Sequence, residues 1–270
     1  MFARHTLSPA SALTQAAVFV VLVFAVPWIV GPWLPPQPQT IWEQIASFVP
    51  GVWAPTVIAI AMMLVTDGRS GFGRQMRGFL RYPSGAGRWL AAAVLLTALV
   101  VFAGVFAARS TGAGRPFMPL GAVGNVLLVA SLTGAVGEEL GWRAFLLSRL
   151  GHLMSPRNAA LAMAVLWALW HLPVFLFADS PYASWPAVPA LLTILSFGTL
   201  MGALFARAKG SVLATILAHL TLNVLLGVGG AQLSSPALWW TTCVLFGATA
   251  LALFQWSYVG HDTVAGEVAT

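Results

Sequence analysis

The chain has 270 residues, of which 59% are hydrophobic and only 7% are charged, and its mean hydropathy is +0.86. A soluble domain of this size carries roughly a quarter charged residues, so most of this surface must face lipid. The net charge of +6 does not indicate a nucleic-acid partner, because the basic residues lie between apolar segments and form no single basic face. The composition therefore predicts an integral, multi-pass protein of the cell membrane.

Eight apolar segments can each cross a hydrocarbon core ~30 Å thick, which takes about twenty helical residues. They lie at residues 12–33, 48–66, 88–108, 121–147, 158–177, 187–207, 211–229 and 236–258. We predict an all-α, polytopic fold with about eight transmembrane helices, in a single membrane domain over residues 1–270. The first segment is expected to remain as an uncleaved span.

The basic residues predict the orientation. With eight spans, eleven of the thirteen Lys and Arg residues fall on one side, and only Arg109 and Arg115 fall on the other. Five of the eleven are arginines in the predicted loop between the second and third segments. Because cytoplasmic loops are enriched in Lys and Arg, we predict that both termini are cytoplasmic. Gly198 and Gly202 form a GxxxG pair, which favours close packing of two helices.

Two adjacent acids lie near the inner end of the fourth segment. Glu139 and Arg143 are four residues apart, so on a helix they share a face and can form an ion pair. Glu138 is turned about 100° away and is not matched by that arginine. This spacing predicts that Glu139 and Arg143 support the structure, whereas Glu138 is free for chemistry. The alternative is that both acids only cap the end of a span.

Two further apolar segments contain polar groups that are costly in lipid. His171 follows Trp167 by one helical turn, and Pro173 interrupts the backbone hydrogen bonding just beyond it. In the seventh segment, His219 and Asn223 are four residues apart and project from one helix face. Each could be a satisfied core residue or a contact between helices, but their joint occurrence favours a functional cluster.

The cluster has the chemistry of a hydrolase. A carboxylate and an imidazole that face one water molecule can act as a general base, and His219 and Asn223 can donate hydrogen bonds to an oxyanion. A zinc site on Glu138, His171 and His219 is the close alternative, although H-E-x-x-H is absent. We favour the metal-free mechanism with no cofactor, since an asparagine is a poor zinc ligand and a good oxyanion donor.

Three motifs in this order resemble those of the CAAX protease and bacteriocin-processing (CPBP, or Abi) family of intramembrane endopeptidases, which includes type II CAAX prenyl proteases. The family's motifs are E-E-x-x-x-R, F-x-x-x-H and H-x-x-x-N. In this chain they read Glu138-Glu139-x-x-x-Arg143, Trp167-x-x-x-His171 and His219-x-x-x-Asn223. The resemblance covers about residues 65–230, the predicted core of the domain, and the ordered set of motifs is specific. One departure is Trp167 in place of the motif's phenylalanine, which changes the shape of the pocket.

The acidic pair lies at the inner end of its segment, so we expect the active site on the cytoplasmic side. The resemblance implies the roles of its residues. Glu138 and His171 would activate water, and His219 and Asn223 would stabilise the oxyanion, with Glu139, Arg143 and Trp167 as supporting residues. It also implies membrane lipid as the surroundings and a peptide or membrane protein as the substrate, including proteins with a prenylated C-terminus.

Non-enzymatic functions are the alternative. Buried Glu and His also occur in proton relays, so a proton-coupled transporter or a bacteriocin immunity factor could use the same cluster. A transporter is expected to contain repeats and paired broken helices, and neither is evident in the sequence.

Overall fold

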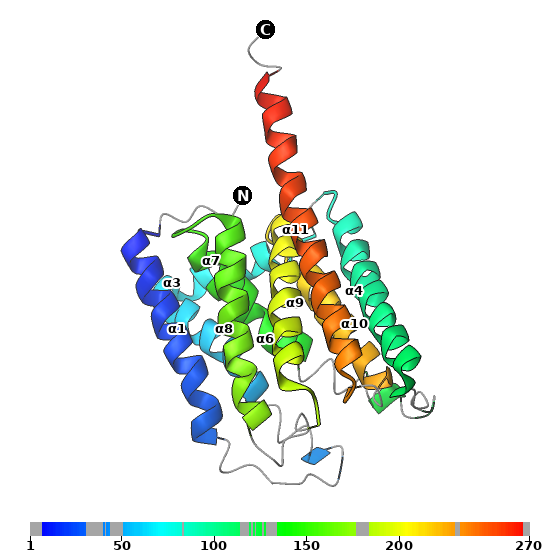
Figure 1. Cartoon of the computed structure of the whole chain (residues 1–270). Helices are drawn as coiled ribbons and strands as arrows, with labels where there is room; N and C mark the ends of the chain where they lie inside the picture. Colours follow the sequence, from blue (N-terminus) through cyan, green and yellow to red (C-terminus); the bar gives the residue numbers. More distant parts are fainter. Residues whose placement is uncertain are drawn as a thin grey trace.

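The computed structural model describes residues 7–30, 51–82, 84–113, 134–176, 184–229 and 233–266, with a few isolated residues between these ranges. All regular structure in these ranges is helical, which confirms the all-α prediction there, and most helices run side by side in one bundle (Figure 1). The elements are α1 (Pro9–Val30), α3 (Ala54–Leu80), α4 (Gly87–Ala108), η2 (Arg109–Ala113), α6 (Val136–Glu139), η4 (Leu140–Leu147), α7 (Ser148–Leu150), α8 (Pro156–Leu176), α9 (Ala187–Arg207), α10 (Leu213–Gly229) and α11 (Pro236–Gly266).

Among the described residues, five helices are long and apolar enough to cross a membrane, namely α1, α4, α8, α9 and α11. The apolar part of α10, Leu213–Val228, is shorter. The second predicted segment falls at α3, and the fourth, 121–147, lies partly outside the described residues. A polytopic membrane protein is therefore supported, whereas the number of eight spans and the cytoplasmic termini stay predictions.

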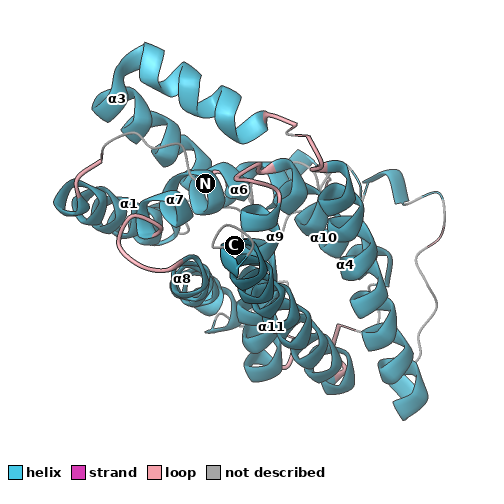
Figure 2. Ribbon diagram, turned by 90° about the horizontal axis from the view of Figure 1, so that it is seen from above, coloured by secondary structure: helices cyan, strands magenta, loops and turns pink. Residues whose placement is uncertain are grey.

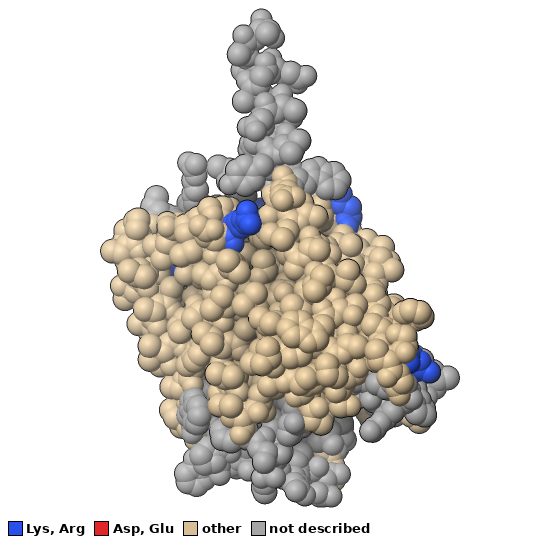
Figure 3. Space-filling view, viewed as in Figure 1, with Lys and Arg blue, Asp and Glu red and all other residues tan. Residues whose placement is uncertain are grey.

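One face of the molecule has an uncharged middle band (Figure 3). On the face shown in Figure 3, the Lys and Arg atoms lie near the upper end and at the lower right edge, and the described residues between them are neither basic nor acidic. Charged groups are costly at mid-depth in a bilayer, so this band is the part of the face that suits hydrocarbon.

Helix α3 extends into the predicted arginine-rich loop, and the prediction of a loop after residue 66 is wrong up to Leu80. The helix breaks at Gly68, whose φ of 65° lies in the left-handed region that glycine adopts without a steric penalty. In Figure 2, one part of α3 lies lengthwise across the view, whereas α8 is seen almost end-on. The part of α3 that follows Gly68 is amphipathic. Its half-buried Phe72, Met76 and Phe79 pack against the core, and the helix also carries three exposed arginines, at positions 69, 74 and 77.

Arg149 was predicted to lie among the basic residues between two spans, but in the structure it is part of the packed bundle. Its side chain is buried, and its Nε donates to Gln15 Oε1 of α1 at 3.2 Å. Nη1 donates to Gln75 Oε1 of α3 at 3.3 Å, and Nη2 lies 3.8 Å from Asp67 Oδ2. A buried guanidinium needs such partners, so Arg149 joins α1, α3 and α7 at one end of the bundle.

Helices α8 and α9 pack closely at the predicted glycine pair. A Cβ on Gly202 would lie 2.4 Å from Ala160 Cβ, and one on Gly198 would lie 3.0 Å from both Ala164 Cβ and Trp167 Cε3. No side chain fits at either glycine without displacing α8. This confirms the close approach that the GxxxG spacing predicted, and it fixes the helix that carries Trp167 and His171.

We expect Gly202→Ala to lower stability by about 1–3 kcal/mol, because the added methyl overpacks the interface with Ala160. Gly247→Ala in α11 is the matched control, since its Cβ would meet Ser196 Oγ only at 3.6 Å, an ordinary contact. Thermal unfolding in detergent measures both variants. Equal midpoints for the two would contradict the close α8–α9 packing.

Candidate active site

The two acids lie on α6, which continues directly into the π-helical segment η4. Both side chains are buried, with Glu138 3% exposed and Glu139 fully enclosed. The segment lies close to α3 because Gly141 has no side chain; a Cβ there would be 2.4 Å from the backbone of Pro55. The glycine thus allows α3 to pack tightly against the residues that follow the acidic pair.

Glu139 has two partners on the same oxygen. Arg143 Nη1 donates to Glu139 Oε1 at 2.9 Å, so the predicted ion pair is present, with both side chains fully buried. His219 Nδ1 donates to the same oxygen at 2.8 Å from α10. The sequence did not indicate this second contact, which ties the first motif to the third.

The sequence suggested that Glu138 has no partner, but in the structure it has one. Its Oε2 accepts a hydrogen bond from the indole Nε1–H of Trp167 at 2.6 Å. Trp167, which was predicted to be a supporting residue that shapes the pocket, thus donates directly to Glu138. The other carboxylate oxygen of Glu138 remains for a further hydrogen bond.

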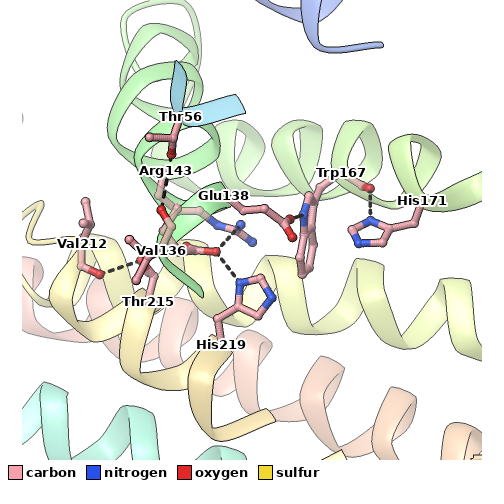
Figure 4. Close-up of polar contacts among 10 residues, drawn as sticks. Thr56, Val136, Glu138, Arg143, Trp167, His171, Val212, Thr215 and His219 are labelled. Atoms are coloured by element: carbon pink, nitrogen blue, oxygen red, sulfur yellow. Dashed lines mark hydrogen bonds and ion pairs between the residues drawn. The ribbon is translucent and has the colours of Figure 1, made fainter. Parts of the chain in front are cut away.

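His171 lies on the opposite side of the same indole (Figure 4). Its Nδ1 is 2.8 Å from the backbone oxygen of Trp167, and the two rings meet edge to face with centroids 5.0 Å apart. A carbonyl oxygen only accepts hydrogen bonds, so Nδ1 carries the proton in this contact. In the neutral ring Nε2 is then the unprotonated nitrogen, which can accept a proton from water.

His219 and Asn223 meet at a residue that the sequence analysis did not identify, Gly134. A Cβ on Gly134 would lie 2.3 Å from Asn223 Nδ2 and 3.2 Å from His219 Nε2. The two side chains of α10 therefore reach the same point, as their spacing predicted. The only signal for Gly134 in the sequence is a glycine four residues before Glu138.

The indole of Trp167 contacts or faces three of the four predicted catalytic side chains, Glu138, His171 and His219. Its centroid lies 5.5 Å from that of His219, and the Arg143 guanidinium lies over the indole at 4.5 Å. Glu138 and His219 are buried, whereas His171 and Asn223 are half-buried. All four predicted catalytic side chains thus lie around one indole and Gly134, and the cluster is more accessible at His171 and Asn223.

The alternative zinc set is not gathered as a metal site in the part of the chain that the structure describes. Among these residues, no three His, Cys, Asp or Glu side chains form a group that could hold a metal ion. One nitrogen of each histidine and one oxygen of Glu138 already have protein partners.

The fold and the site together define a helical membrane protein with a buried cluster of carboxylate, imidazole and amide groups. Residues 119–225 match the family of type II CAAX prenyl endopeptidases described as Rce1-like. The chain is also 27% identical, over 105 residues, to CAAX prenyl protease 2 of Methanococcus maripaludis. These matches confirm the resemblance to the CAAX protease family that the three motifs indicated, and the family match includes all four clustered residues.

The match to the archaeal relative is partial. It covers 36% of this chain and 38% of the length of that relative. The predicted extent of the core, 65–230, therefore stays a prediction, and so do the activity and substrate of the whole protein.

Proposed function

We propose that this protein is an intramembrane endopeptidase of the CAAX-prenyl-protease type, which hydrolyses a peptide bond with an activated water molecule. The observation that carries the proposal is the cluster in which Glu138, His171 and His219 surround the indole of Trp167 and Asn223 meets His219 at Gly134. A cluster of this composition is costly to bury in a membrane bundle unless its polar groups are used. The hydrogen bonds within the fold leave at least one polar atom of each of these four side chains available for the reaction.

The first step is the activation of water by Glu138 and His171. One carboxylate oxygen of Glu138 bonds Trp167, and the other is available to accept a proton from water. His171 offers Nε2, since its Nδ1–H is held by the carbonyl of Trp167. The water oxygen then attacks the peptide carbonyl carbon, and the accepted proton passes to the leaving amine as the C–N bond breaks.

The second step is the stabilisation of the oxyanion by His219 and Asn223. Asn223 Nδ2 is an N–H donor, and it lies near His219 Nε2 at Gly134. A protonated His219 donates through both ring nitrogens, with Nδ1–H on Glu139 and Nε2–H on the oxyanion. Glu139 holds the His219 ring through Nδ1, so Glu139 supports the oxyanion site in addition to its ion pair with Arg143.

The substrate is a peptide or membrane protein that reaches the cluster from the lipid, with the site on the cytoplasmic side. The name of the archaeal relative, a CAAX prenyl protease, supports a prenylated C-terminal segment as the first substrate to test. Such a substrate brings its scissile bond to the membrane through its lipid chain.

Purified protein in detergent is expected to cleave a prenylated peptide that ends in a CAAX sequence, with the products identified by mass spectrometry. The same peptide without the lipid is expected to be cleaved more slowly, because it lacks the apolar chain that concentrates it near the site. Absence of cleavage of both peptides, and of unrelated membrane substrates, would contradict the proposed peptidase activity.

A chelator arm of the same assay tests the metal-free mechanism. We expect the initial rate to stay within about twofold after incubation with a zinc chelator, because the base in this mechanism is a carboxylate with an imidazole. Loss of activity that returns on addition of Zn²⁺ would instead support the alternative ligand set of Glu138, His171 and His219.

A further inference from the structure

Trp167 contacts both groups to which the proposed function gives the activation of water. Its indole Nε1–H donates to Glu138 Oε2 at 2.6 Å, and its backbone oxygen accepts from His171 Nδ1–H at 2.8 Å. One residue thus fixes a carboxylate from α6 and an imidazole from its own helix, α8. Figure 4 shows the indole between these two side chains.

The indole itself is held rigidly. The Arg143 guanidinium lies over its face at 4.5 Å, and Gly198 of α9 leaves only enough room for the edge of the ring, since a Cβ there would be 3.0 Å from Cε3. Its side chain is 2% exposed. A donor fixed in this way restrains the carboxylate that it bonds, because the ring cannot turn to follow a displaced Glu138.

We propose that Trp167 is a positioning residue whose indole N–H orients Glu138 for the attack of water. This inference rests on the proposed function. The hydrogen bond occupies Oε2 and leaves Oε1 as the oxygen that accepts the proton. The related motif has phenylalanine at this position, and phenylalanine has no such donor. In this chain the orientation of Glu138 therefore depends on a contact that the motif does not encode.

The test compares Trp167→Phe with Trp170→Phe in the full chain. Trp170 is the matched control, because it lies on the same helix and meets the His171 ring at the same 5.0 Å centroid distance and 89° angle as Trp167. Its Nε1–H donates to the backbone oxygen of Val23, at 3.3 Å, and not to an acid. Both variants remove a buried indole beside His171, but only one removes the donor to Glu138.

We expect Trp167→Phe to lower kcat by about 10- to 100-fold, since a misplaced catalytic group reduces the rate by up to about 10². KM should change less than about twofold, and both constants should stay near those of the wild type in Trp170→Phe. An equal fall of kcat in the two variants, or a kcat of Trp167→Phe within about twofold of the wild type, would overturn the proposal. If Trp167→Phe does not fold, benzothienylalanine at position 167 takes its place in the test. This analogue keeps the ring shape without the N–H, and we expect it to show the same fall in kcat.

A second readout does not depend on peptidase activity. Thermal unfolding of Trp167→Phe, Glu138→Ala and the double variant forms a cycle that measures the coupling of the two side chains. We expect a clear coupling, with a smaller effect of Trp167→Phe when Glu138 is absent. If the effects of the two single substitutions on the unfolding midpoint add up to that of the double variant, the two side chains are not coupled and the hydrogen bond is disproved. Coupling in a protein that cleaves no substrate would mean that the proposed function fails while the contact itself is real.

Discussion

Replacing Glu138 by glutamine is expected to lower kcat by about 10² to 10⁴, the range for loss of a general base. The amide oxygen can still accept the hydrogen bond from Trp167 Nε1–H, so the side chain can stay in place. The amide cannot take a proton from water at neutral pH. The loss should therefore appear in kcat, while substrate binding and thermal stability change little.

Asp67→Asn is the matched control for this substitution. Asp67 is a carboxylate near the middle of α3, directly before the break at Gly68, and its Oδ2 accepts hydrogen bonds from Gln75 at 2.7 Å and Thr66 at 2.9 Å. The same change from carboxylate to amide should leave kcat within about twofold, because Asp67 is not a general base in this mechanism. Glu138→Gln with wild-type activity would remove Glu138 from the mechanism.

Replacing Asn223 by alanine is expected to lower kcat by about 10² to 10³, the range for loss of one oxyanion donor. Gly134→Ala should also lower kcat, because its Cβ would lie 2.3 Å from Asn223 Nδ2 and must displace that amide. Initial rates at saturating peptide measure both effects. Asn223 lies on α10 and Gly134 lies just before α6, yet both substitutions act on the same donor.

Thr221→Ala is the control on α10. The hydroxyl of Thr221 donates to the backbone oxygen of Leu217 within the helix, so its removal leaves Asn223 untouched. We expect its kcat to stay near that of the wild type. If Asn223→Ala and Gly134→Ala were as active as Thr221→Ala, the oxyanion site would have to lie elsewhere.

Contacts within one helix were predictable from the sequence. The spacing of Glu139 and Arg143 indicated an ion pair, and the structure contains it at 2.9 Å. The spacing of His219 and Asn223 indicated a common face, and both side chains reach Gly134. These contacts follow from helical geometry alone, because residues four apart are neighbours on a helix surface.

Contacts between helices were not predictable in the same way. Glu139 and His219 are 80 positions apart in the sequence, and Glu138 and Trp167 are 29 apart. Such hydrogen bonds depend on how α6, α8 and α10 pack, and no local spacing encodes that packing. This explains why the sequence predicted Trp167 as a supporting residue without its hydrogen bond to Glu138, and why it did not indicate Gly134.

The arginine-rich segment after Gly68 shows a different failure. Its arginines and its place between two apolar segments indicated a loop. The spacing of Phe72, Met76 and Phe79 instead gives one apolar face, and burial of that face against the core stabilises the helix up to Leu80. Tertiary packing overrides local propensity in this segment.

The most direct test of the account is a single-turnover cleavage of the prenylated peptide in oxygen-18-labelled water with hydroxylamine present. The central claim is that water activated by Glu138 and His171 attacks the peptide bond. The account predicts one labelled oxygen in the new C-terminal carboxylate and no hydroxamate product, with the label incorporated at least 10²-fold more slowly by Glu138→Gln. A hydroxamate would reveal an acyl-enzyme intermediate, and that result would contradict direct attack by water.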